Sequence, residues 1–183
     1  MNEEGIIRFH CHWKPSGPVL PQTLLPMVNR WRSLLRSMEL LGVSPEGVGF
    51  GNISLRSKGR GLFYITGTGT GHLEELGTEH FALAEECLPE KNRLTCSGPV
   101  RASSESMSHA AVYESLPEVQ AVVHIHQMEY WEKLRGRIPT TPEYAEYGTP
   151  GMVLEIIKLL KDKNMVASRL LVMGGHPEGM IAY

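Results

Sequence analysis

The amino-acid sequence predicts an α/β protein with a single main domain. Residues 23–41 and 152–161 repeat apolar side chains with the period of about 3.6 residues that an amphipathic helix requires. Short runs rich in β-branched and aromatic residues, bounded by glycine and proline, are typical of strands. A chain of 183 residues can bury a core without disulfides. We expect residues 21–183 to form the domain and residues 1–20 to form an N-terminal arm.

Composition and charge narrow the class of protein. A hydrophobic content of 42%, a charged content of 21% and a formal net charge of -2 give no reason to expect binding to nucleic acid or to an anionic membrane. No apolar run approaches the roughly 18 residues of a membrane span, and the acidic N-terminus does not resemble a signal peptide. The 3 cysteines contain no Cys-x-x-Cys pair, which favours reduced thiols. We therefore expect a cytoplasmic protein.

The first segments of the chain predict a strand and a helix. Residues 5–13 have the composition of a strand and include His10 and His12 on one strand face. No carboxylate or glycine loop stands beside this pair, so we interpret the segment as an edge strand or arm rather than as a metal site. The helix over residues 23–41 has a natural stop at Gly42. We expect solvated charges at the arginines that fall largely on its polar face, which are Arg30, Arg32 and Arg36.

A glycine-rich stretch follows. Residues 49–56 predict a strand entered through a glycine turn, residues 58–61 a hairpin turn and residues 62–65 a second strand. The segment Thr66–Gly71 could bring backbone N–H groups close to an anion, with threonine hydroxyls as further donors. It lacks the Gly-Lys-Ser/Thr ending of a Walker loop, and no clear helix follows it. A mobile loop without a ligand is the alternative interpretation.

A polar helix start occurs in the middle of the chain. Ser103 or Ser104 can cap a helix that runs to about Ser115, and the exposed N–H groups at its start would favour an anion. Glu105 and His109 are four residues apart and therefore share a helix face. The alternatives to a chemical role are that Glu105 stabilises the helix dipole and that His109 packs or caps.

Three histidines follow buried strands. His124 and His126 end the predicted strand that begins at Val119, and because they are two residues apart they project from one face. His176 follows the strand predicted over residues 169–173. Three imidazoles with a carboxylate upstream form the ligand set of a catalytic zinc site, whereas structural sites are usually closed and rich in cysteine. Histidines bonded to water or backbone are the alternative.

The remaining segments are short. Residues 81–88 and 93–96 predict two strands, although the first also has the composition of a helix. Residues 128–134 predict a short helix and residues 138–147 a loop or short strand. A last short strand closes the chain after His176.

The ordered segments resemble the class II aldolase/adducin family. The resemblance covers about residues 23–182 and depends on the order and spacing of its motifs, which are Gly51-Asn52-Ile53-Ser54, Ile65-Thr66-Gly67, Ser103-Ser104-Glu105, His109 with Tyr113, Ala121-Val122-Val123-His124-Ile125-His126, and His176. It implies a three-layer α/β/α fold with a central, mostly antiparallel (mixed) sheet covered by helices on both faces. It also implies a homo-oligomer, with a tetramer favoured.

The resemblance implies a role for each site residue. Zn2+, or another divalent metal such as Mn2+, Fe2+ or Co2+, would be bound by His124, His126 and His176. Glu105 would be the catalytic acid/base. Tyr144, supplied by a neighbouring subunit, would protonate the leaving side of the substrate, with Tyr147 as the alternative. The substrate phosphate would be held by Asn52, Thr66, Gly67, Ser103 and Ser104.

The implied reaction is the aldol cleavage of a small phosphorylated ketose. The metal would act as a Lewis acid on the substrate oxygens and stabilise an enediolate, while Glu105 moves the proton. An epimerase or dehydratase acting on a sugar phosphate, and a non-catalytic adducin-like binding module, are the alternatives.

The chain departs from the family pattern in three places. Thr66–Gly69 reads Thr-Gly-Thr-Gly rather than Thr-Pro-Ser-Gly, Pro177-Glu178-Gly179 follows His176 where a glycine is more usual, and the C-terminus is expected to be shortened.

Overall fold

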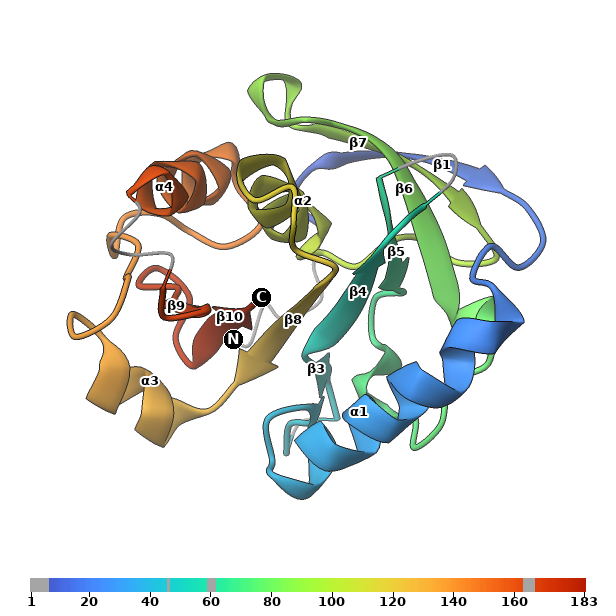
Figure 1. Ribbon diagram of the computed structural model, residues 1–183, viewed down its shortest axis with the longest axis horizontal. Coiled ribbons are helices and arrows are strands. Elements are labelled where there is room, and N and C mark those ends of the chain that lie inside the picture. Colours follow the sequence, from blue (N-terminus) through green and yellow to red (C-terminus); the bar gives the residue numbers. More distant parts are fainter. Residues whose placement is uncertain (1–6, 46, 59–61, 163–166) are drawn as a thin grey trace.

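A central β-sheet organises the computed structural model, which describes residues 7–45, 47–58, 62–162 and 167–183 (Figure 1). Within these residues the sheet has 8 strands in the order β1-β7-β6-β5-β4-β8-β10-β9. Adjacent strands of the sheet are antiparallel, except that β1 and β7 are parallel. The strands are β1 (His10–Pro15), β4 (Asn52–Arg56), β5 (Phe63–Thr66), β6 (Phe81–Leu88), β7 (Arg93–Gly98), β8 (Ala121–His126), β9 (Leu170–Val172) and β10 (Gly179–Ala182). Helices lie on both faces, so the predicted three-layer α/β/α fold is confirmed.

The central strands give the sheet two chemically different faces. β4 pairs with β8 so that Ile53 lies opposite Val123 and Asn52 lies opposite His124. Because successive side chains of a strand alternate between faces, the apolar residues other than Val122 share one face and the polar residues share the other. The polar face carries Asn52, Ser54, His124 and His126, which are all buried. The strands that build the core therefore also carry the candidate site.

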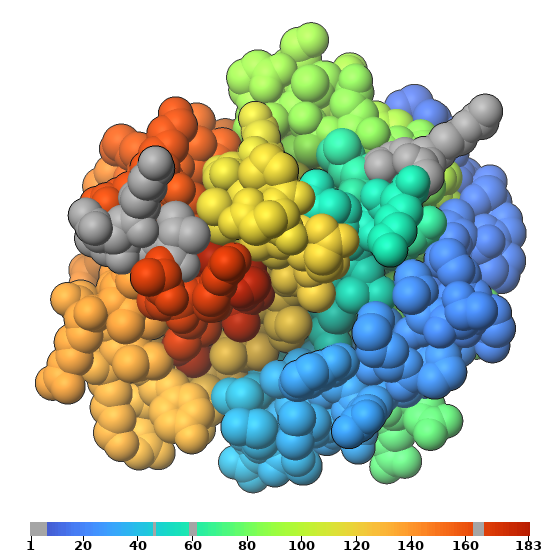
Figure 2. Space-filling model, viewed as in Figure 1, coloured from blue at the N-terminus to red at the C-terminus, as the bar shows by residue number. Residues whose placement is uncertain are grey.

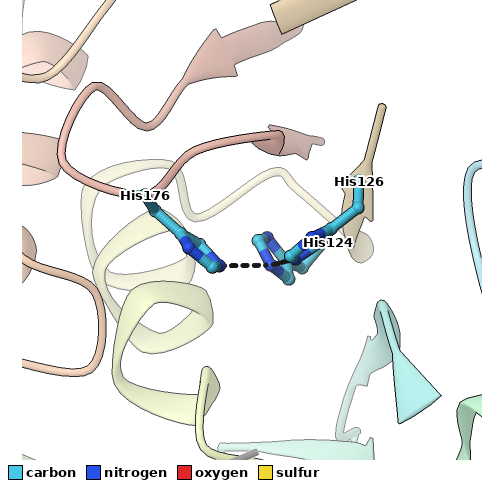
Figure 3. A group of neighbouring side chains, drawn as sticks. All are labelled: His124, His126 and His176. Carbon is cyan, nitrogen blue, oxygen red and sulfur yellow. Dashed lines mark hydrogen bonds between the residues drawn. The ribbon is translucent and has the colours of Figure 1, made fainter. Parts of the chain in front are cut away.

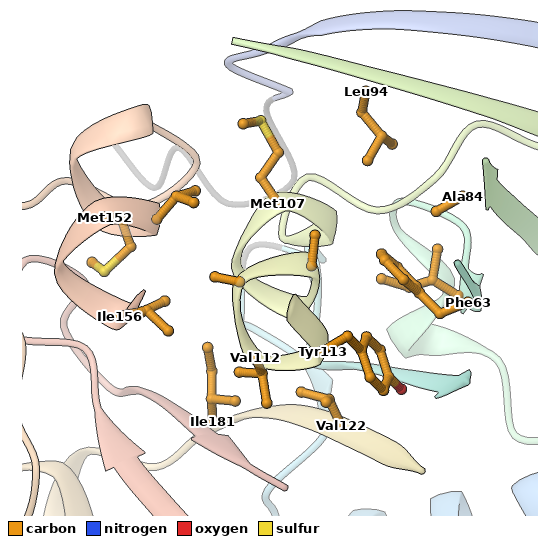
Figure 4. Packing of buried hydrophobic residues seen from close by; sticks show 14 of the residues in the cluster. Phe63, Ala84, Leu94, Met107, Val112, Tyr113, Val122, Met152, Ile156 and Ile181 are labelled. Carbon is orange, nitrogen blue, oxygen red and sulfur yellow. The ribbon is translucent and has the colours of Figure 1, made fainter. Parts of the chain in front are cut away.

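Helices α2 (Ser106–Ser115) and α4 (Pro150–Lys161) cover this polar face. Most residues of α2 are buried, because the helix is enclosed between the sheet and α4. Figure 4 shows Met107 of α2, Met152 of α4 and Ile181 of β10 within one apolar cluster. The start of α2, which follows Glu105, is held in place by packing on several sides.

Helices α1 (Leu25–Ser37) and α3 (Met128–Leu134) lie on the other face. The first helix is shorter than predicted, because Glu39 adopts a left-handed conformation (φ 58°) just after its end. The apolar pattern continues beyond the helix, since Leu40 and Leu41 are buried in the segment that follows. Among the described residues, no helix is long and apolar enough to cross a membrane.

Much of the apolar face of α1 is exposed. Three of its apolar side chains are exposed, and so is that of Met38, the residue after its end. The three are Met27, Trp31 and Leu34. A cavity of about 600 Å³ lies between α1 and the apolar face of β4, β8 and β10. In Figure 2 the surface is hollowed between the blue atoms of α1 and the deeper strands. The helical layer on this face is therefore thinner than the layer formed by α2 and α4.

Arg32 corrects the expectation that the arginines of α1 are solvated. Its side chain is fully buried, and Nη2 donates hydrogen bonds to the carbonyl oxygens of Thr70 (3.2 Å) and Leu73 (2.7 Å). Arg36 likewise donates to the carbonyl oxygen of Gly71. Burial, followed by repulsion from Arg36, lowers the pKa of Arg32 to about 10, so the side chain stays charged at neutral pH. Helix α1 therefore anchors the glycine-rich loop.

Other predicted boundaries move by a few residues. The strand predicted over residues 49–56 is broken at Gly51 (φ 77°), which separates β3 (Gly49–Phe50) from β4. β3 pairs with β2 (Gly42–Val43) in a small hairpin that was not predicted. Residues 138–147 form a loop, with isolated bridges at Thr140 and Glu146. Residues 1–6 of the expected arm and residues 59–61 of the expected hairpin turn lie outside the described residues.

The N-terminal strand lies at the sheet edge, as predicted. It runs from His10 to Pro15, and both His10 and His12 are exposed. The predicted strands over residues 81–88 and 93–96 are β6 and β7, and the predicted short helix is α3. The division of the chain at residue 20 stays a prediction.

We predict that Arg32→Ala lowers the free energy of unfolding by about 2–3 kcal/mol, because it removes the charge-assisted hydrogen bonds to the carbonyl oxygens of Thr70 and Leu73. Urea unfolding followed by circular dichroism measures the change. Arg30 is exposed on the same helix, so Arg30→Ala is the matched control and should change stability by less than about 0.5 kcal/mol. Equally small effects of the two substitutions would contradict the anchoring role of Arg32.

Candidate metal centre

Three histidine rings converge on one point beside the sheet. His124 and His126 extend from β8, and His176 extends from the turn between β9 and β10 (Figure 3). The Nε2 atom of His124 lies 2.8 Å from that of His126 and 3.3 Å from that of His176. All three rings are buried. The ligand set predicted from the sequence is therefore brought together, with one nitrogen of each ring turned inward.

Strand pairing explains this convergence. His124 and His126 share a face of β8 because they are two residues apart. β10 pairs with β8 so that Gly179 lies opposite His126, which brings the turn containing His176 alongside. The Gly179 N–H donates to the carbonyl oxygen of His176 (2.9 Å). A Cβ atom at Gly179 would lie 2.5 Å from His176 Cδ2, so only glycine leaves room for the ring.

Residues from the neighbouring helix and loop support the His176 turn. The indole N–H of Trp131, on α3, donates to the carbonyl oxygen of Met173 (3.0 Å). The Gly174 N–H donates to Thr141 Oγ1 (2.9 Å). The turn is therefore tied to two separate parts of the chain, and His176 has little freedom to leave the cluster.

Burial keeps the cluster in the form that binds metals. Burial lowers the pKa of His124 well below its usual value, and the neighbouring histidines lower it further. Burial also lowers the pKa of His176, and the nearby His126 and Arg8 lower it further. A neutral imidazole has one nitrogen free to bind a metal, whereas a protonated ring has none. The two rings are thus uncharged near neutral pH.

The inward nitrogens fit a divalent metal. A tetrahedral zinc ion with Zn–N bonds of ~2.0–2.1 Å keeps its ligand nitrogens roughly 3.3 Å apart. The three ring nitrogens all lie within 4.8 Å of one another, and the two closest separations are 2.8 and 3.3 Å. Three histidine ligands leave one position of a tetrahedral ion open for water or substrate.

The two predicted tyrosines lie in different places. Tyr147 stacks on the ring of His176, with centroids 4.4 Å apart, and the Arg8 guanidinium lies 4.6 Å from the centre of the Tyr147 ring. Tyr144 is 74% exposed, and its hydroxyl donates to Glu155 (3.1 Å). The structure therefore places Tyr147 against the cluster and Tyr144 at the surface.

The predicted acid/base residue is buried at the start of α2. Glu105 is 1% exposed, and its Oε2 atom accepts a hydrogen bond from Ser108 Oγ (2.9 Å). The expected cap is corrected, because the residue before the helix is Glu105 rather than a serine. Ser103 Oγ instead accepts from the N–H of Glu105 (3.3 Å). The backbone N–H and the side-chain carboxylate of Glu105 are thus both hydrogen-bonded to nearby serines.

A buried polar chain connects α2 with β4. His109 Nδ1 lies 2.7 Å from Ser54 Oγ, and Ser54 Oγ lies 2.9 Å from the Tyr113 hydroxyl. Burial lowers the pKa of His109 to about 3. Sequence reasoning assigned no role to Ser54, although its spacing of two from Asn52 indicates the same strand face. His109 therefore occupies a buried position, where its ring bonds to Ser54.

The residues predicted to hold a phosphate lie close to one another in the fold. Gly67 pairs with Ala102 in an isolated bridge, and the Ser104 N–H donates to Thr68 Oγ1 (3.2 Å). Thr66 Oγ1 accepts from the Ile53 N–H (3.3 Å). The loop after β5 and the start of α2 therefore meet beside β4. The predicted side chains there, Asn52, Thr66, Ser103 and Ser104, are buried.

One glycine of the loop serves packing. A Cβ atom at Gly71 would lie 2.3 Å from the carbonyl oxygen of Gly42 and 2.7 Å from the backbone nitrogen of Phe50. The glycine-rich sequence is therefore needed in part because the β2–β3 hairpin lies directly against it. On the side of His126 there is a pocket of about 430 Å³, which Phe50, Gln127 and Glu178 help to line.

Comparison with known proteins identifies the family. A model of the class II aldolase and adducin N-terminal domain matches residues 34–147. The chain belongs to this family. The match includes His124, His126 and the start of α2, whereas His176 follows the matched residues. A comparison with curated protein sequences finds no match.

Solved structures share the fold. The chain is similar to L-fuculose 1-phosphate aldolase, with 16% identity and a TM-score of 0.62 over 91% of this chain and 77% of that chain. It is also similar to YgbL from Klebsiella pneumoniae, described as a putative aldolase/epimerase/decarboxylase, with 18% identity and a TM-score of 0.62 over 90% of this chain and 80% of that chain. An aldolase II superfamily protein from Pseudomonas syringae matches with 15% identity and a TM-score of 0.60, over 90% and 68% of the two chains.

We predict that the metal-free protein loses stability as the pH falls below about 6.5. The pKa values of His109, His124 and His176 are lowered in the folded state, whereas in the unfolded chain these groups titrate near their usual value. Below that value the unfolded state binds more protons, so each histidine lowers the free energy of unfolding by up to about 1.4 kcal/mol per pH unit. Urea unfolding of chelator-treated protein between about pH 7.5 and 4.5 measures the slope.

The variant His109→Gln tests the assignment of this slope. It removes one buried imidazole, so its free energy of unfolding should depend less steeply on pH than that of the wild type. A wild-type stability that stays constant over the same pH range would contradict the buried, neutral state of these rings.

Proposed function

We propose that this protein is a metal-dependent aldolase, a carbon–carbon lyase that cleaves a small phosphorylated ketose. The observation that carries the proposal is the convergence of three buried histidine nitrogens in a member of the class II aldolase and adducin family. A binding module without chemistry has no need of such a buried ligand set. The phosphate-binding role of the nearby loops adds the substrate class.

The metal is held by His124, His126 and His176 in this proposal, with Zn2+ as the first candidate. Imidazole also suits iron and the other divalent metals of this series. When bound, the ion supplies a Lewis acid for adjacent oxygens of the substrate. The histidines hold this position at the end of the interior strand β8, next to Asn52, one of the residues that would receive the phosphate.

Glu105 acts as the acid/base residue. Aldol cleavage leaves negative charge on the carbon next to the substrate carbonyl, and a proton must be delivered to that carbon. The Ser108 hydroxyl bonds to one oxygen of Glu105, which fixes the carboxylate plane. Its buried position excludes water that would compete for the proton. The Glu105 side chain therefore gives the proton in one direction of the reaction and removes it in the other.

The substrate phosphate is placed at the meeting of the loop after β5 with the start of α2. Backbone N–H groups at a helix start and threonine and serine hydroxyls are suitable donors for an anion. The proposed ligands are Asn52, Thr66, Gly67, Ser103 and Ser104. Asn52 lies opposite His124 across the β4–β8 pair, so it connects the phosphate position with the metal position.

A neighbouring subunit completes the proposed site. Tyr144 is exposed at the surface and its hydroxyl bonds to Glu155, as expected of a residue that could act on the site of another subunit. We propose a homo-oligomer, with a tetramer as the first candidate.

The 3 cysteines are free thiols in the structure, which agrees with a cytoplasmic location.

We predict that the purified protein binds about one divalent ion per chain and that His124→Ala/His126→Ala abolishes this binding, because two of three ligands are lost. Metal content after equilibration with Zn2+ and gel filtration, read by plasma mass spectrometry, measures the effect. His10→Ala/His12→Ala is the matched control, since it removes a pair with the same spacing from the exposed edge strand. Equal metal in the two double variants would exclude the proposed centre.

We predict that Glu105→Gln keeps the metal and slows proton exchange at the substrate carbon by about 10²–10⁴-fold, because the amide cannot take up the proton. A panel of phosphorylated ketoses, assayed for aldehyde release and for deuterium uptake, identifies the substrate and measures the rate. Glu114→Gln, at an exposed position of the same helix, is the control. Undiminished exchange in Glu105→Gln would refute its role, and an epimerised or dehydrated product without aldehyde would favour those reactions over the aldolase.

A further inference from the structure

The turn that carries His176 contains a strained residue. The Gly179 N–H donates to the His176 carbonyl oxygen (2.9 Å), so residues 176–179 form a β-turn. Pro177 occupies its second position, and Glu178 occupies its third position with a φ of 69°. Such a turn is of type II, in which glycine or asparagine is strongly favoured at the third position. A glutamate there adopts a left-handed conformation that its Cβ atom disfavours.

The glutamate side chain reaches a metal ligand from this position. Glu178 Oε2 lies 3.8 Å from His126 Nδ1. The other ring nitrogen of His126, Nε2, points into the cluster, 2.8 Å from the Nε2 atom of His124. The carboxylate therefore faces the outer nitrogen of the ring and does not belong to the inner ligand set.

The backbone keeps the two residues together. The Gln127 N–H donates to the carbonyl oxygen of Glu178 (3.0 Å). Gly179 is paired with His126 across β8 and β10. The turn is thus tied to the strand on both sides of its glutamate, which keeps the Glu178 backbone beside the ring of His126.

We propose that Glu178 is a positioning residue for metal binding by His126. At 3.8 Å the carboxylate lies just beyond hydrogen-bond distance of Nδ1, and a small rotation of the partly exposed Glu178 side chain brings it within reach. A carboxylate there accepts the Nδ1–H of the metal-bound ring, which leaves the lone pair on the inner nitrogen and makes it a stronger ligand. The left-handed backbone at Glu178 is the cost of placing this carboxylate. The inference rests on the proposed metal centre and adds to it a residue outside the three ligands.

Glycine and glutamine at this position separate the two effects. Glu178→Gly removes both the carboxylate and the backbone strain, so the metal-free protein should unfold at a higher urea concentration while its Zn2+ affinity falls about tenfold. Glu178→Gln keeps the strained backbone and an oxygen acceptor, so its urea midpoint should stay unchanged and its affinity should fall several-fold. Competition with a chromophoric chelator measures affinity, and urea unfolding in excess chelator measures stability.

Glu39→Gly is the matched control. Glu39 is also a left-handed glutamate (φ 58°), and it lines the same pocket as Glu178. This variant relieves strain and removes a negative charge from the pocket, but His126 keeps its neighbour. Its Zn2+ affinity should stay within about twofold of the wild type.

The outcomes distinguish this inference from the proposed function. A wild type that binds no metal overturns the proposed function. A wild type that binds metal, with equal affinity in Glu178→Gly, overturns only the role of Glu178. A Glu178→Gly variant that loses both affinity and stability also overturns it, because the glutamate would then be supporting the turn rather than the ligand.

Discussion

The close approach of three buried imidazoles is the constraint on which the site depends. Their inner nitrogens are 2.8 and 3.3 Å apart for the two closest pairs, in a region from which water is largely excluded. Such separations allow the Nε2–H of one neutral ring to bond to the next ring, or a cation to lie between the nitrogens. Neither contact fixes the positions of all three rings, so the fold has to hold them. It does so with the β8–β10 pairing and with the turn that contains His176.

Central strand pairs supply this rigidity at little extra cost, because the same strands form the core. On β4 and β8 most apolar residues pack toward α1 and α3, and the polar residues pack toward α2 together with Val122. Helix α2 is enclosed on most sides, so it can hold Glu105 and the His109–Ser54 hydrogen bond without exposure to solvent. Arg32 and Arg36 extend the arrangement by anchoring the glycine-rich loop from the opposite face.

Local periodicity made the strands and the shared face of His124 and His126 predictable, because a spacing of two places side chains on one strand face whatever the rest of the chain does. Burial of Arg32 was not predictable in this way. Helical periodicity assigned it to the polar face, but only the tertiary fold shows that a loop covers that face. The β2–β3 hairpin was too short to leave a pattern. The choice between Tyr144 and Tyr147 depends on the path of a loop, and the left-handed backbone of Glu178 is visible only in the structure.

A crystal structure of the Zn2+-loaded protein, with anomalous diffraction collected at the zinc absorption edge, tests the central claim most directly. The account predicts one anomalous peak enclosed by His124, His126 and His176, at ~2.0–2.1 Å from the Nε2 atom of each ring. An anomalous map with no peak among these three rings, or a peak only at His10 and His12, would contradict it.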